Sequence, residues 1–315
     1  MALTLAQAAL LSEDDLQRGV IETFVQTSPV LDRIPLMNIE GNAYSYNSEA
    51  TLPGVAFRSV NEAYVESTGT VVQASESLVI LGGDADVDRF IVQTRGNLND
   101  QRATQTAMKV KSASYKFQDT FFNGDVAVDT KSFDGLKKRL TGAQVIDTDT
   151  NGLGPVAGGH DFLDALDRLI ASVPGINGAN GAIYANAGIQ ARLSSSLRRL
   201  GGGDFIREEL TGKRVMVYNG IPILDPGATA AGVTILPQTE TQGTAAGTSA
   251  SVYAVKFGAD EGDQAVTGLT NGGVQVDDLG ELQEKPAFRT RIEFYCGLAT
   301  FGGQAAARLQ GVLAS

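Results

Sequence analysis

The longest stretch of the sequence without glycine or proline runs from residue 97 to residue 123. Because the chain has 37 glycines among 315 residues, an uninterrupted segment of this length predicts one long helix. At about 1.5 Å per residue it would be roughly 40 Å long. One face is small at its start and aromatic at its end, with Ala103, Ala107, Val110, Ser114, Phe117 and Phe121. We expect this face to pack on a sheet.

The segments before the long helix lack a core of their own. An apolar face with Leu16, Val20 and Phe24 predicts an amino-terminal helix that ends before Pro29. From residue 41 to residue 75, short β-like runs alternate with turn residues and predict a long two-stranded flap. A two-stranded ribbon is only marginally stable alone in water. We therefore expect the arm and the flap to rest on another surface.

The rest of the chain predicts a mixture of strands and helices. We predict strands at 77–81, 87–92, 182–184, 215–218, 221–224 and 288–295, and helices at 133–140, 162–173, 189–200 and 305–312. Pro222 predicts that its strand lies at a sheet edge, because proline cannot donate to a ladder. The low-complexity residues 239–251 predict an exposed loop.

Composition narrows the classes of function. Acidic residues outnumber basic ones by 36 to 25, and the net charge of −11 argues against a basic nucleic-acid reader. A single Cys296 and a single His160 leave little for a disulfide, a zinc site or histidine catalysis. No segment approaches about 18 consecutive apolar residues, and residues 2–11 lack the basic leader of an export signal. We expect a soluble intracellular protein with no catalytic centre, cofactor or membrane contact.

Asp147, Asp149, Asn151 and Gly152 match the opening of a calcium loop. The twelfth position of such a loop should be a bidentate glutamate, but here it is Gly158. These residues are therefore weak metal candidates, and an Asx-rich turn is the favoured interpretation.

Three aspartates alternate along a predicted strand: Asp84, Asp86 and Asp88. They could line an ion site between subunits, but a solvated strand face is the favoured interpretation. No metal is therefore predicted at this position.

The order of these parts is specific: an arm, a β flap, a strand pair, a very long helix, an inserted α/β unit and a closing strand. With residues 28–36 (SPVLDRIPL), 52–58 (LPGVAFR) and 121–125 (FFNGD), it resembles the major capsid proteins of tailed bacteriophages, whose HK97-like fold is shared with encapsulin shells. The resemblance implies an α+β fold with an amino-terminal arm (1–40), an extended loop (41–75), a peripheral domain (76–133) with a spine helix (97–123), an axial domain (134–270) and a peripheral return (271–315).

The resemblance also implies a function and partners. The expected protein is a shell subunit that forms pentamers and hexamers and closes into an icosahedral container for double-stranded DNA. It would assemble in the host cytoplasm and reside in the virion. Its expected partners are other copies of itself, a separate scaffolding protein, a portal and an optional decoration protein. Two alternatives stay open: an encapsulin-like compartment and, from a different class, a calcium-dependent binding module or an enzyme.

Chemistry alone selects candidate residues for these roles. The candidates for contacts between subunits are Phe24, Leu31, Tyr44, Tyr46, Phe57 and Arg58, and the candidates for facing DNA are Arg102, Lys109, Lys111 and Lys116. For these four cations, ordinary solvated charge on the outer face of a helix is an alternative of equal weight to the DNA-facing role. Because no lysine lies in the flap, we expect a shell without the covalent lysine cross-links of some family members.

Overall fold

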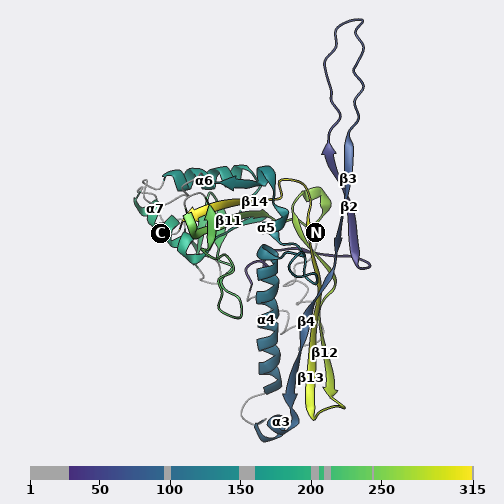
Figure 1. The fold of residues 1–315 in the computed structure, drawn as a ribbon, viewed down its shortest axis with the longest axis vertical. Helices are drawn as coiled ribbons and strands as arrows, with labels where there is room; N and C mark the ends of the chain where they lie inside the picture. Colours follow the sequence, from purple (N-terminus) through teal and green to yellow (C-terminus); the bar gives the residue numbers. More distant parts are fainter. Residues whose placement is uncertain are drawn as a thin grey trace.

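The computed structural model of the chain describes residues 28–95, 101–148, 160–199, 206–208, 214–242 and 245–313. The predicted amino-terminal helix, with Phe24, lies outside these residues. The fold is α+β, as predicted, with a four-stranded sheet, an eight-stranded sheet and a separate two-stranded hairpin that projects beyond both (Figure 1).

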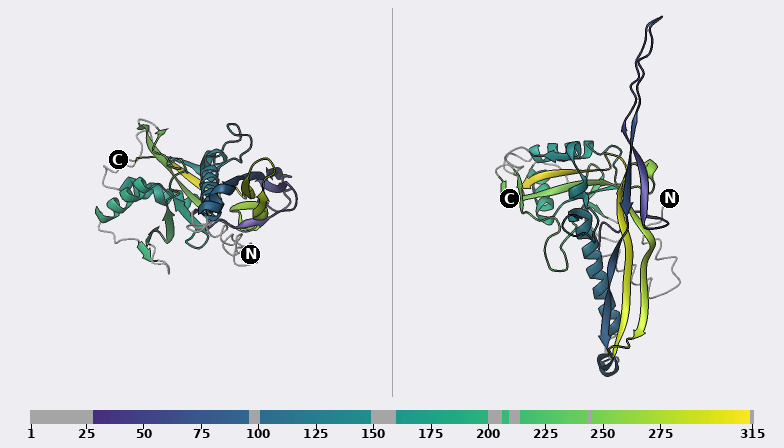
Figure 2. Two further views of the ribbon diagram at one scale, coloured as in Figure 1. Left: turned by 90° about the horizontal axis from the view of Figure 1, so that it is seen from below. Right: turned by 45° about the vertical axis from the view of Figure 1, so that its right-hand side comes forward.

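The four-stranded sheet is long and narrow. Its strands are, in spatial order, β1 (Leu36–Asn38), β12 (Val266–Glu281), β13 (Ala287–Thr300) and β4 (Val79–Asp88). The predicted long helix is present as α4 (Gln101–Asn123) and runs alongside this sheet (Figures 1 and 2). Strand β13 alternates as expected, with Thr290, Ile292 and Phe294 buried.

The predicted packing face of α4 is correct only in its carboxyl half. Val110, Ser114, Phe117 and Phe121 are buried, whereas Ala103 and Ala107 are exposed. The reason is that only the carboxyl end of α4 also reaches the eight-stranded sheet. There, the Phe122 ring lies 5.3 Å from the rings of both Tyr184 and Tyr253, measured between centroids.

The strand predicted at 87–92 is wrong. Strand β4 continues through Gly82 and Gly83 to Asp88, and helix α3 (Arg89–Arg95) follows at once. The Asp88 carboxylate accepts a hydrogen bond from the Phe90 N–H at 2.7 Å. This capping bond satisfies a free amide at the start of the helix, and it explains why an apolar run here is helical.

The eight-stranded sheet forms the second body. Its strands are β5 (Val145–Asp147), β14 (Ala306–Leu313), β11 (Ala245–Lys256), β6 (Gly181–Tyr184), β9 (Ile221–Leu224), β8 (Arg214–Tyr218) and β7 (Ile206–Glu208), with β10 (Glu240–Gln242) paired to β11. Helices α6 (His160–Ala171) and α7 (Ala187–Arg199) share one apolar core with this sheet. Three short helices complete the fold: α5 (Leu136–Arg139) and the 3-10 turns η1 (Gly142–Gln144) and η2 (Glu261–Asp263).

Three sequence-based expectations fail in this sheet. The predicted final helix is strand β14, because a bulge near Gly311, whose φ is 84°, breaks the strand alternation and imitates helical spacing. The predicted loop at 239–251 contains β10 and much of β11, whose small residues pack closely in the sheet. Pro222 lies in β9, an interior strand between β6 and β8. It is tolerated because β9 pairs with β6 only from Ile223 onward.

The two sheets also divide the chain differently from the expected boundaries. Strand β14 belongs to the eight-stranded sheet and not to the sheet of β13, and β12 continues across residue 270. The segment 28–36 is likewise not a coreless connector, because Val30, Leu31 and Ile34 are fully buried in the main core.

Candidate assembly surface

The projecting hairpin is the feature that the other described residues leave uncovered. It consists of β2 (Ala43–Thr51) and β3 (Thr70–Ser77), paired antiparallel, with residues 52–69 as its tip. The tip extends far from both sheets (Figure 1). The flap predicted at 41–75 is therefore present.

The hairpin tip exposes large apolar side chains. Their exposed fractions are 76% for Leu52, 99% for Val55, 108% for Phe57, 89% for Val60, 69% for Tyr64 and 87% for Val65. Apolar side chains gathered on one exposed element mark an interaction site in a soluble protein. The tip is thus a candidate interaction surface that the other described residues do not cover.

The far end of the tip has its own internal order. The Arg58 guanidinium lies 5.2 Å from the centre of the Tyr64 ring. The Glu62 carboxylate accepts a hydrogen bond from the Ser59 N–H at 2.9 Å, and the Glu62 N–H donates to the Ser59 carbonyl at 3.2 Å. These local bonds fix a turn that presents Phe57 and Val60 to solvent.

An aromatic cluster holds the root of the hairpin. The Tyr46 ring lies 4.8 Å from the Phe301 ring and the Tyr44 ring 6.3 Å from it, measured between centroids. The Tyr46 hydroxyl donates to the Thr300 carbonyl at 3.2 Å, and the Tyr44 hydroxyl donates to the Glu261 carboxylate. This second bond, made to a carboxylate, raises the pKa of Tyr44 to about 12.

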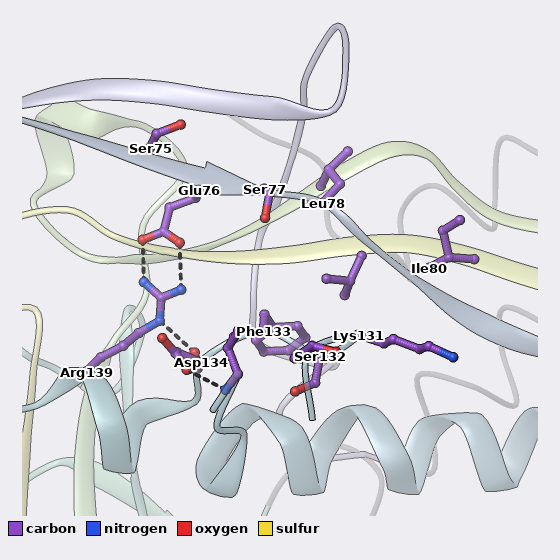
Figure 3. A pocket seen from close by; sticks show the side chains of 13 residues that line it. Ser75, Glu76, Ser77, Leu78, Ile80, Lys131, Ser132, Phe133, Asp134 and Arg139 are labelled. Atoms are coloured by element: carbon purple, nitrogen blue, oxygen red, sulfur yellow. Dashed lines mark hydrogen bonds and ion pairs between the residues drawn. The ribbon is translucent and has the colours of Figure 1, made fainter. Parts of the chain in front are cut away.

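An ion pair fixes the other strand of the root. Arg139 on α5 donates two hydrogen bonds to the Glu76 carboxylate on β3, at 2.5 and 2.7 Å, and its Nε donates to the Asp134 carbonyl at 2.6 Å (Figure 3). The side chains are only 15% and 19% exposed. A bidentate pair between an arginine and a carboxylate fixes the relative orientation of the two side chains in addition to attracting them. Both strands of the hairpin are therefore anchored to the body.

We expect Arg139→Ala to loosen the hairpin. The substitution leaves the Glu76 carboxylate without its cation and should lower the free energy of unfolding by about 1–3 kcal/mol. It should also increase amide exchange over residues 43–51 and 70–77, measured by hydrogen–deuterium exchange. The matched control is Lys138→Ala, because Lys138 is 52% exposed in its pair with Asp125 and should change stability by less than about 0.5 kcal/mol. Equal exchange in both variants would contradict the anchoring role.

The structure separates the candidates for subunit contacts. Leu31 is fully buried and Tyr46 is 9% exposed, so both are corrected to residues that stabilise their own chain. Tyr44 is half-buried in the root. Phe57 and Arg58 lie on the exposed tip. Sequence reasoning missed Val55, Val60, Tyr64 and Val65, although apolar residues in so polar a segment were a usable signal. No sequence signal connects Glu76 with Arg139 or Tyr44 with Glu261.

The four cations of α4 do not form one stripe. Arg102, Lys109 and Lys116 recur every seven residues and lie on one flank, whereas Lys111 is about half a turn away from Arg102 around the helix. Arg102 pairs with Asp278 at 2.6 Å and lies over the Phe288 ring, and Lys111 lies 5.8 Å from the Tyr115 ring centre. The DNA-facing role thus stays a prediction, and Arg102 already has partners within its own chain.

The alternating aspartates form an ion-pair ladder. Asp84 pairs with Arg291 at 2.8 Å, and Asp86 pairs with Arg289 at 2.6 Å and with Lys285 at 2.5 Å. Hydrogen bonds from these cations lower the pKa of both carboxyl groups. Two of the three aspartates are thus ion-paired within the chain and not merely solvated, and the third, Asp88, caps α3.

This ladder predicts an acid-sensitive contribution to stability. Because the folded-state pKa of Asp86 lies below the unfolded value of about 3.9, the stabilisation is complete above that value and is lost as the pH falls below it. Asp86→Asn should lower stability at pH 7 and flatten the decline in unfolding free energy below about pH 5. Urea titrations between pH 7 and pH 2 would measure this. Asp164→Asn, an exposed change on α6, is the control. If the unfolding free energy of Asp86→Asn fell with decreasing pH as steeply as that of the wild type, the prediction would be refuted.

The calcium-loop candidates are mostly outside the described residues. Asp147 ends β5, and its carboxylate accepts a hydrogen bond from the Gln310 side chain. Asp149, Asn151 and Gly152 lie outside the described ranges. Within those ranges, no three histidine, cysteine or acidic side chains come together to hold a metal ion. In the same part of the chain, no helix is long and apolar enough to cross a membrane.

Comparison with sequence families gives one match. Residues 12–154 match the family described as "Major capsid protein GP7". This range contains the hairpin, β4 and α4. No curated protein matches the sequence.

Comparison with solved structures gives similar folds at low identity. The chain is similar to the holo-SrpI encapsulin complex from Synechococcus elongatus PCC 7942, with a TM-score of 0.66, 17% identity, and coverage of 100% of this chain and 98% of that chain. The chain is also similar to the capsid of a native GTA particle, with a TM-score of 0.62, 14% identity, and coverage of 91% of this chain and 90% of that chain. A structure from Mycobacterium phage Bobi has a TM-score of 0.60 and 14% identity, and the match covers 90% of this chain and 89% of that chain. These likenesses show a shared fold.

Proposed function

We propose that this chain is a major capsid protein of the HK97-like kind and that it builds its shell from pentamers and hexamers around double-stranded DNA; the family match over residues 12–154 and the shared fold support this proposal. In this proposal, the protein forms the shell of the virion. The observation that supports it is the projecting hairpin, whose root is anchored and whose tip is uncovered. An element of this kind gains burial only from a neighbour.

The same proposal extends to the parts of the shell. The body with the four-stranded sheet would be the peripheral domain, and the body with the eight-stranded sheet the axial domain that meets at capsomer centres. Phe57 and Arg58 on the tip would contact a neighbouring copy. Lys109 and Lys116 would face the packaged DNA. Scaffolding and portal proteins would act as partners in the host cytoplasm, with a decoration protein as an optional addition, and no step requires a catalytic residue.

Electron microscopy of the purified, assembled protein tests this function. We expect closed icosahedral particles with capsomers resolved as pentamers and hexamers, and discrete small oligomers at every concentration would overturn the proposal. Because residues 41–75 contain no lysine, a denaturing gel of intact particles should show single chains. A ladder of covalently joined chains would contradict that part.

An encapsulin-like compartment is the second candidate, favoured by the full-length similarity to the SrpI encapsulin. The two functions differ in what the shell encloses. Nuclease-protected DNA in purified particles supports the capsid, whereas protein cargo without protected DNA supports the compartment.

A further inference from the structure

A small polar cavity opens where α5, β10 and β14 meet, and we call it the β10–β14 pocket. Its volume is about 250 Å³. Sites that hold drug-sized ligands have volumes of roughly 300–1,000 Å³, so this one suits a small ion. Every side chain that lines it is polar or charged: Lys137, Glu240, Thr241, Gln242, Arg308 and Gln310.

Arg308 is held rigidly in the wall of the pocket. Its side chain is only 11% exposed, and its Nη2 donates to the Glu240 carboxylate at 2.9 Å. Its Nε donates to the Ser251 hydroxyl at 2.8 Å, and the guanidinium carbon lies 6.0 Å from the centre of the Tyr253 ring. Among the described residues, Nη1 has no hydrogen-bond partner. A fixed guanidinium with N–H groups to spare is preorganised for an oxygen anion.

The charges that line the pocket leave one positive charge in excess. The only carboxylate among the lining side chains is that of Glu240, which is 16% exposed. It accepts hydrogen bonds from Arg308 and from the Ser251 hydroxyl, and the Lys137 ammonium lies 3.3 Å from it. Two cations therefore share one carboxylate. A small anion would balance the remaining charge in a cavity where water screens it less than on an open surface.

Strand β10 supplies neutral donors to the same pocket. The Thr241 hydroxyl oxygen accepts a hydrogen bond from the Gly247 N–H at 3.1 Å, which leaves the hydroxyl hydrogen for a ligand. The Gln242 side chain lies over Gly311, where an added Cβ would come within 2.5 Å of the Gln242 Cγ. The glycine at this bulge in β14 therefore makes room for Gln242 in the wall.

The arrangement of these donors favours a tetrahedral anion. The sixth lining residue, Gln310, donates to the Asp147 carboxylate, and Asp147 itself lies outside the lining. The remaining donors come from three elements, α5, β10 and β14. Donors that approach from three elements match the oxygens of a phosphate group better than those of a planar carboxylate.

We propose that the β10–β14 pocket binds a phosphate group, with Arg308 and Lys137 on its oxygens and Thr241 and Gln242 as further donors. Inorganic phosphate and the phosphate of a nucleoside monophosphate share this chemistry. The pocket belongs to a single chain, so phosphate binding does not depend on the proposed shell function.

Isothermal titration calorimetry of the purified protein in a phosphate-free buffer tests this site. Inorganic phosphate, adenosine monophosphate and acetate are titrated separately at constant ionic strength, because salt screens contacts between charges. We expect one saturable site per chain, with a Kd below about 1 mM for inorganic phosphate or adenosine monophosphate. Acetate should bind about fivefold more weakly or worse, because it offers two oxygens to donors from three elements.

Variants of two neighbouring lysines locate the site. Lys137→Gln should weaken phosphate binding about tenfold, because it removes the excess positive charge and a hydrogen bond from a charged donor. Lys137 is 48% exposed in its pair with Glu240, so the fold should tolerate the change. Lys137→Arg keeps the charge and should bind within about threefold of the wild type. The matched control is Lys138→Gln, which pairs with Asp125 outside the pocket and should bind within about twofold.

Each outcome decides for or against the pocket. Binding that Lys137→Gln weakens and Lys138→Gln leaves unchanged supports it, and the tighter ligand identifies the source of the phosphate group. No saturable binding up to about 10 mM, equal binding by Lys137→Gln, or acetate as tight as phosphate would overturn it. If circular dichroism shows Lys137→Gln unfolded, Gln242→Ala decides instead: about threefold weaker binding supports the pocket, and unchanged binding overturns it. Particles that close normally without phosphate binding would overturn this site alone.

Discussion

Phe122→Ala is expected to lower the free energy of unfolding by about 3–5 kcal/mol, because truncating a fully buried phenylalanine removes its apolar burial and leaves a cavity. The Phe122 side chain is completely buried and lies against Phe121, Tyr184 and Tyr253. It joins the carboxyl end of α4 to the eight-stranded sheet, and so its loss should also weaken the contact between the two bodies. Urea denaturation followed by circular dichroism would measure the change.

Phe90→Ala is the matched control for this effect. Phe90 is 72% exposed on α3, and so the same chemical truncation should change stability by less than about 0.5 kcal/mol. Equal losses in the two variants would show that α4 does not anchor the second sheet through Phe122.

Phe57→Asp combined with Val60→Asp should reduce particle formation at least tenfold without destabilising the isolated chain. Both side chains are almost completely exposed, so the folded protomer loses no internal contact. A neighbour that covers the tip would instead have to bury two carboxylates, which is costly unless they are paired. Light scattering would measure assembly, and the melting temperature of unassembled chains would confirm that the fold is intact.

Val233→Asp is the control for the tip variant. It places a carboxylate at another exposed apolar position, far from the hairpin in sequence, and should assemble like the wild type. Normal particle yield from the tip variant would mean that the hairpin tip is not an assembly contact.

How far the sequence could predict the protein differs from element to element. The long helix and the two-stranded flap followed from local patterns: a segment free of glycine and proline, and β-like runs between turn residues. The strands in the segment 239–251 could not be predicted from local patterns, because threonine, serine, alanine and glycine in such a run are typical of a loop. Strand β14 could not be predicted as a strand either, because one bulge gives its buried residues the spacing of a helix.

The candidate site divides in the same way. Phe57 and Arg58 could be selected from the sequence, since an apolar and a basic residue stand together in a projecting turn. The root contacts could not, because Glu76 and Arg139 lie 63 residues apart and Tyr44 and Glu261 lie 217 apart. Such pairs depend on the path of the whole chain.

By itself the sequence determined the order of the parts, the lengths of the long helix and the flap, and the acidic charge, because each depends on neighbouring residues. Only the tertiary structure decided that Leu31 and Tyr46 belong to the interior, that two aspartates of β4 neutralise cations on β13, and that two cations share one carboxylate in the β10–β14 pocket. The physical reason is that burial and ion pairing are settled by which distant segments meet, and local patterns carry no record of that.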